Sequence, residues 1–145
     1  MDRQQKALDL FRHRCNCSQA VFTAYRQPEH LDEESALKIA TIFGGGGAGT
    51  GNGLCGAVAG ALMALSMRYG MGDLQATDAK RATYELGCKF MDDFAAAMGS
   101  CSCEAILGIN IGTPENLLKA REMKLFETRC EDAVKTASQL LERLL

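Results

Sequence analysis

The chain has 145 residues, of which 47% are hydrophobic and 23% are charged, and its formal net charge is −2. This length and composition predict a single globular domain, residues 1–145, with a hydrophobic core of its own. The nearly balanced charge argues against nucleic acid as a partner. The longest uncharged apolar segment, residues 54–67, is too short to span a bilayer, so we expect no membrane insertion. The N-terminus lacks an apolar signal segment, which favours a cytoplasmic, reducing location.

Capping signals and the spacing of apolar residues divide the chain into helices. We expect helices over residues 2–13, from 16 or 18 to about 26, 32–43, 54–69, 76–98, 103–107, from 113, and from about 129 or 130 to the end. No segment alternates in the way that a half-buried strand does. The prediction is an all-α single-domain helical bundle of about six to seven helices.

A glycine-rich loop, residues 44–53, precedes the expected central core helix. It satisfies the G-x-G-x-x-G pattern only because glycine fills most of its positions, and it follows a helix instead of a strand, so a dinucleotide site is not expected. A flexible turn is the simpler interpretation. The more specific one is that its N–H groups bind a cofactor or an anion, with Gly44, Gly45, Gly46 and Gly53 as the candidates.

Four of the seven cysteines lie at or near expected helix starts. They are Cys17, Cys55, Cys103 and Cys130. A helix N-terminus offers unpaired N–H groups and the positive end of a dipole, and both favour the thiolate that binds metals or attacks disulfides. If the fold brings them together, the four can form a thiolate site.

The other three cysteines have simpler interpretations. Cys15 and Cys101 are the first members of two Cys-x-Cys pairs, and positions i and i+2 of a helix face away from each other. We therefore expect Cys17 and Cys103, not their neighbours, to serve the site. Cys88 lies inside a long helix, where a small buried hydrophobic residue is expected. His13 is expected to be a solvated helix-end residue, and no Cys-x-x-Cys-His is present, so c-type haem is not expected.

The combination of short motifs resembles one known family. The segments are residues 16–21 (NCSQAV), 43–46 (FGGG) and 55–60 (CGAVAG), followed by Cys103 and Cys130. In this order they resemble the C_GCAxxG_C_C family of redox-active proteins. The resemblance implies that Cys17, Cys55, Cys103 and Cys130 are the family's four cysteines. Related domains occur in larger redox proteins with iron centres, which implies an iron–sulfur cluster as one cofactor.

Three functions remain open on these residues. In the first, Cys17, Cys55, Cys103 and Cys130 bind a metal or a small iron–sulfur cluster for electron transfer. In the second, the metal-free protein carries out thiol–disulfide or peroxide-reducing chemistry, with Cys55 as the nucleophile and Cys55 and Cys17 as the candidate catalytic residues. In the third, the thiols are structural. The redox partner is not identified, and the alanine- and leucine-rich helix faces are compatible with a homodimer.

Overall fold

The computed structural model describes all residues, 1–145, as eight α-helices without a β-strand. Their bounds are α1 Arg3–Arg12, α2 Cys17–Tyr25, α3 Glu33–Ala40, α4 Gly56–Tyr69, α5 Thr77–Met98, α6 Cys103–Leu107, α7 Pro114–Glu122 and α8 Glu131–Leu144. A 3-10 turn, Thr41–Phe43, extends α3, and a π-helical turn, Phe126–Cys130, runs directly into α8. The predicted all-α fold is confirmed, with eight helices where about six to seven were expected.

Local side-chain caps explain where several helices begin. Asp2, Asn16, Asp32, Ser102 and Thr113 each accept a hydrogen bond from a backbone N–H in the first turn of the following helix. At α2 the cap is reciprocal, because Asn16 accepts from the N–H of Gln19 while the Gln19 side chain accepts from the N–H of Asn16. These contacts depend on near neighbours, which is why sequence alone located these starts.

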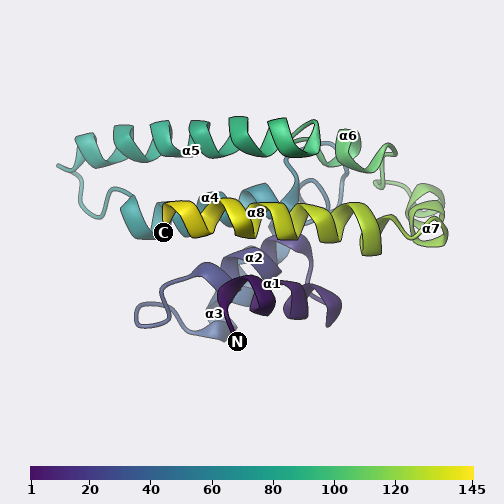
Figure 1. Cartoon of the computed structure of the whole chain (residues 1–145), viewed down its shortest axis with the longest axis horizontal. Helices are drawn as coiled ribbons and strands as arrows, with labels where there is room; N and C mark the ends of the chain where they lie inside the picture. The colour runs from purple at the N-terminus through teal and green to yellow at the C-terminus, as the bar shows by residue number, and fades with distance from the viewer.

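The helices form three layers (Figure 1). The long helix α5 lies on one side, α4 and α8 form the middle, and α1, α2 and α3 lie on the other side. Helix α4 packs against α2, α5 and α8 and is therefore the central helix that the apolar segment predicted. The core contains Val21, Leu65, Phe90, Phe94 and Leu141, all with at most 1% exposure. No helix is both long and apolar enough to cross a membrane.

Glycines on α4 allow α2 to approach closely. A Cβ atom at Gly60 would lie 2.7 Å from the Ser18 carbonyl oxygen, and one at Gly56 would lie 3.1 Å from the Cys17 Cβ. Any larger residue would force the two backbones apart. The helix that makes this close approach is α2, which carries Cys17.

One sequence prediction about α5 was wrong. Cys88 is exposed, not buried. Only Phe90 and Phe94 of this long helix are fully buried. Helix α5 covers the bundle from one side only, so its buried face is narrower than its apolar content indicated.

Candidate thiol site

Cys17 and Cys55 come together at the crossing of α2 and α4. Cys17 is the first residue of α2, and Cys55 directly precedes Gly56, the first residue of α4. Because Gly56 carries no side chain, the Cys17 side chain lies against the start of α4. The C-G-A-x-x-G element therefore both supplies Cys55 and makes room for Cys17.

A short backbone pairing brings Cys103 beside Cys55. The N–H of Cys55 donates to the carbonyl of Cys101 over 2.7 Å, and the N–H of Cys103 donates to the carbonyl of Gly53 over 3.0 Å. These two bonds make an isolated antiparallel bridge between Leu54 and Ser102. The end of the glycine-rich loop is thereby fixed to the segment that starts α6.

Cys130 reaches the site from the π-helical turn before α8. It is the last residue of Phe126–Cys130, and the helical backbone continues through it into Glu131. The expectation of a helix start near Cys130 therefore needs correction, because the helical run extends further toward the N-terminus. A π turn widens a helix locally and changes the direction in which its side chains project, and such turns are frequent at functional sites.

The structure groups the same four cysteines that the sequence selected. Electrostatic interactions between thiols join every pair among Cys17, Cys55, Cys103 and Cys130. Cys15 and Cys101 take no part in these interactions, although Cys15 lines the adjoining cavity. The Cys101 thiol instead donates to the carbonyl of Met91, and Cys88 is exposed on α5.

Cys17 and Cys130 form a hydrogen-bonded pair of thiols with opposite pKa shifts. The Cys17 thiol donates to the Cys130 sulfur, and this bond, together with burial, raises the pKa of Cys17 well above its usual value. The same bond lowers the pKa of Cys130, against the effect of burial and with help from the positive charge of Arg129. Cys130 is therefore the more acidic thiol of the pair, and Cys17 is the one that holds its proton more strongly.

Cys55 and Cys103 are held as neutral thiols. Burial raises the pKa of Cys55 to about 12, although the N–H groups of Ala57 and Val58 act in the opposite direction. Burial and the neighbouring Cys130 raise the pKa of Cys103 to about 11. The helix-start argument anticipated a low pKa at Cys55, but at this site the loss of hydration outweighs the dipole of one helix.

A cavity of about 550 Å³ opens onto the four thiols. Twelve of its 20 lining residues are hydrophobic. Cys17 and Cys130 are only partly buried, whereas Cys55 and Cys103 have 5% and 8% exposure.

Of the four glycines proposed for cofactor binding, only Gly45 lines this cavity. Gly44 packs on the Asn16 side chain, where a Cβ would come within 2.3 Å of Nδ2. Gly46 and Gly53 pack on each other, since a Cβ on Gly53 would lie 2.4 Å from the Gly46 carbonyl oxygen. The loop therefore mainly joins the segments that carry Cys17, Cys55 and Cys103. His13 is exposed and does not line the cavity.

The four sulfurs do not form a preorganised site for a single metal ion. No group of three or more histidine, cysteine or carboxylate side chains is arranged so that it could hold one. A single tetrahedral ion needs four sulfurs about 2.3 Å from one point. The thiols converge on a shared cavity without meeting this condition.

Sequence reasoning missed Arg129, which acts on Cys130 from the adjacent position. Its guanidinium donates to the carbonyls of Ile106 over 2.9 Å and Met98 over 3.4 Å, which fixes the π turn against α6 and the end of α5. The adjacency of arginine and cysteine in the sequence was the one available signal. The contacts that hold the arginine there come from distant segments.

Comparison with known proteins identifies the family to which the chain belongs. Searches of curated proteins and of solved structures return no match to the chain. One family model matches residues 15–144, which include all four grouped cysteines, and its description is "Putative redox-active protein (C_GCAxxG_C_C)". Since the match covers nearly the whole chain, the protein belongs to the C_GCAxxG_C_C family.

Proposed function

We propose that the protein is a thiol–disulfide redox protein whose reacting pair is Cys17 and Cys130. The observation that carries the proposal is that Cys17 and Cys130 line the same cavity, where each shifts the pKa of the other in the opposite direction. Two thiols that line the same cavity and interact with each other are candidates for a disulfide. The difference in their pKa values supports a division of labour in which the Cys130 thiolate attacks and Cys17 follows.

Cys55 and Cys103 have a supporting role in this proposal. Both are neutral and nearly buried, so they add no charge that would repel the Cys130 thiolate. This assignment replaces Cys55 by Cys130 as the attacking sulfur. It keeps Cys17 in the catalytic pair.

The experiment is peptide mapping of the reduced protein before and after oxidation by a small disulfide. We expect one reversible bridge, between Cys17 and Cys130, that dithiothreitol removes. The Cys17→Ala variant should stop at a mixed disulfide on Cys130. Cys15→Ala and Cys101→Ala are the matched controls, since each removes the other cysteine of a Cys-x-Cys pair, and both should form the bridge normally. A bridge through Cys15 or Cys101 would refute the assignment.

We propose, as a second function for the same sulfurs, binding of an iron–sulfur cluster or another thiolate-bound metal centre. The convergence of four cysteines from four segments favours it, because the dithiol reaction uses only two of them. Cys17, Cys55, Cys103 and Cys130 would hold the group, which would supply one-electron transfer. Four thiolates are the usual donor set of an iron–sulfur cluster, and because no group of three or more such side chains is arranged to hold a metal ion, binding would require the four sulfurs to move.

Iron, zinc and acid-labile sulfide analysis of protein purified without oxygen separates the two functions. Stoichiometric iron and sulfide that Cys55→Ser abolishes would favour the cluster. Metal-free protein that forms the Cys17–Cys130 bridge would favour the dithiol. Cys55→Ser should leave that bridge in place.

A further inference from the structure

The cavity beside the thiols extends well beyond the sulfur atoms. Its apolar lining comes from α1, α6, α7 and the segments next to them, and includes Phe11, Ile106, Leu107, Ile111, Leu117 and Phe126. A volume of about 550 Å³ lies within the range of about 300–1,000 Å³ found for small-molecule sites. The cavity is therefore suited to a small substrate that reaches the sulfurs from outside.

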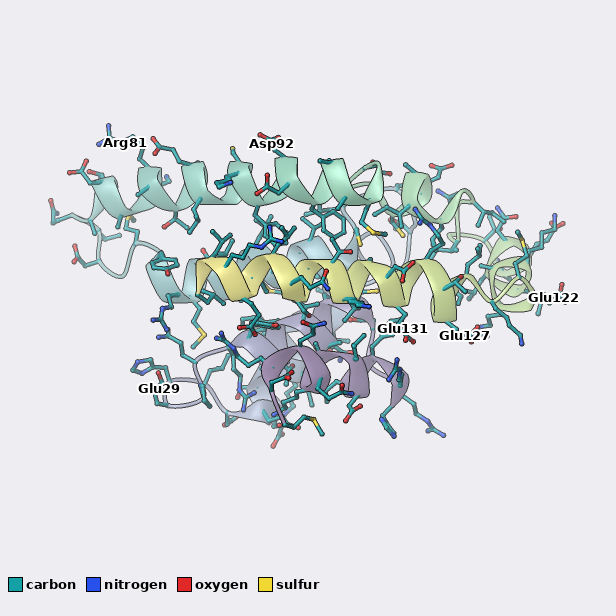
Figure 2. All side chains as sticks on the ribbon, viewed as in Figure 1. Glu29, Arg81, Asp92, Glu122, Glu127 and Glu131 are labelled. Carbon is teal, nitrogen blue, oxygen red and sulfur yellow. The ribbon has the colours of Figure 1, made fainter.

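Among the charged side chains that line this cavity, positive charges outnumber negative ones. They are Arg12, Arg14, Arg121, Glu127 and Glu131. Arg12 forms an ion pair with Glu131. Arg14 and Arg121 form no ion pair. Figure 2 shows Glu127 and Glu131 together near the start of α8, so both acidic side chains come from one part of the lining.

The backbone fixes Arg14 in an uncommon conformation next to the reacting cysteines. Its φ of +79° lies in the left-handed region, which costs a non-glycine residue free energy. The N–H of Cys15 donates to the carbonyl of Leu10 over 3.1 Å, and the Asn16 cap of α2 follows directly. These contacts hold the turn between α1 and α2, so the position of the Arg14 backbone at the cavity is defined.

We propose that this cavity binds a small disulfide that carries carboxylate groups, and that Arg14 and Arg121 bind those carboxylates. The inference rests on the proposed dithiol function and names its substrate class. A guanidinium presents parallel N–H donors that match a carboxylate, and it remains charged at all physiological pH values. The apolar lining accommodates the carbon chain between the carboxylate and the sulfurs.

The reaction balances with the protein and this substrate alone. The Cys130 thiolate attacks one substrate sulfur, the substrate S–S bond breaks, and one substrate thiolate leaves. Cys17, as it loses its proton to that leaving thiolate, then attacks the Cys130 sulfur and releases the second thiolate, which takes a proton from water. The protein dithiol is oxidised by two electrons, and the substrate disulfide is reduced to two thiols.

Three disulfides of similar size and different charge test the proposal. The probes are 3,3′-dithiodipropionate, which is anionic, bis(2-hydroxyethyl) disulfide, which is neutral, and cystamine, which is cationic. The measured quantity is the second-order rate constant for formation of the Cys17–Cys130 bridge in the full-length reduced protein. We expect the anionic probe to react on the order of tenfold faster than the cationic one at low salt, with the difference shrinking at high salt.

Single substitutions assign the preference to the two arginines. Arg14→Gln and Arg121→Gln should each slow the anionic probe by about two- to fivefold and leave the neutral probe unchanged. Arg143→Gln is the matched control, because it removes the same charge from an exposed position in the last turn of α8, and it should leave the rates of all three probes unchanged. Glu127→Gln should accelerate the anionic probe.

The outcomes separate this inference from the function on which it rests. If no probe forms the Cys17–Cys130 bridge, the dithiol function fails. If the bridge forms at equal rates with all three probes, or fastest with cystamine, the dithiol function stands and the carboxylate preference is wrong. An equal effect of Arg143→Gln would show that net charge, not the cavity, sets the rates.

Discussion

The surroundings of Cys130 act on its pKa in opposite directions, and the net effect is a lower pKa. The hydrogen bond from Cys17 and the charge of Arg129 lower its pKa, while burial acts in the opposite direction. Cys55 lacks a comparable partner, so burial decides its state. A helix start alone is therefore a weaker source of thiolate stability here than a thiol donor and a nearby guanidinium.

The pH dependence of alkylation should report this difference. Because its pKa is lowered from the ordinary value of 9.0, Cys130 should react with iodoacetamide at lower pH than the five cysteines whose pKa values are raised, which are Cys15, Cys17, Cys55, Cys101 and Cys103. Cys17→Ala removes the hydrogen-bond donor and should move the Cys130 midpoint upward, and Arg129→Gln should do so to a smaller extent. Mass spectrometry of labelled peptides provides the rates.

Cys15→Ala is the control for that experiment. Cys15 lines the same cavity but does not interact with Cys130, so its removal should leave the Cys130 profile in place. A Cys130 midpoint at or above that of Cys15 would contradict the assignment of Cys130 as the more acidic thiol.

Among the helices, the α2–α4 crossing is the contact on which the site depends most. Gly56 and Gly60 set the distance between these helices, and the crossing positions Cys17 beside Cys55. A methyl group at Gly60 would lie 2.7 Å from the Ser18 carbonyl oxygen and 3.1 Å from the Phe22 nitrogen. These neighbours are backbone atoms, which cannot move aside as a flexible side chain can.

Gly60→Ala should therefore destabilise the protein by about 1–3 kcal/mol, as expected for overpacking. Gly87→Ala on α5 is the matched control, because its Cβ would meet only the end of the Leu62 side chain at 3.4 Å. That change should stabilise α5 by about 0.5–1 kcal/mol, since glycine is a poor helix former. Denaturant unfolding measures both values, and equal effects of the two substitutions would refute the close-approach argument.

Prediction from sequence was most successful for elements defined by local interactions. The starts of α2, α3 and α7 follow from Asn16, Asp32 and Thr113-Pro114, whose partners lie within four residues. The π turn before Cys130 was not predicted. Its contacts run from Arg129 to carbonyls more than 20 residues away, which no local pattern contains.

For the molecule as a whole, the buried thiols should make the folded state less stable at alkaline pH. Burial raises the pKa of Cys55 from 9.0 to about 12. Below 9 the thiol is protonated in both the folded and the unfolded protein, so its contribution is fully present. Between 9 and 12 the unfolded chain loses the proton first, and stability falls as pH rises.

The contribution of Cys55 to the free energy of unfolding should decrease by up to about 1.4 kcal/mol per pH unit between its unfolded pKa of 9.0 and its folded pKa of about 12. The measurement is urea unfolding of the reduced, metal-free protein at several pH values, compared with Cys55→Ala. The stability difference between the two proteins should shrink as pH rises from 9. Cys88→Ala, at an exposed position, should retain the wild-type dependence. A difference between wild type and Cys55→Ala that stays constant with pH would contradict the assignment.

By itself the sequence determined the all-α fold and most helix boundaries, and it singled out four cysteines that line one cavity. Helix caps, apolar spacing and the small residues of the C-G-A-x-x-G element act over a few positions, so they can be predicted from neighbouring residues in the sequence. Only the tertiary structure decided that the thiols of Cys17 and Cys130 shift the pKa values of each other, and which charges line the cavity. Cys17 and Cys130 come from opposite ends of the chain, and their contact arises from the packing of α2 and α8 around α4.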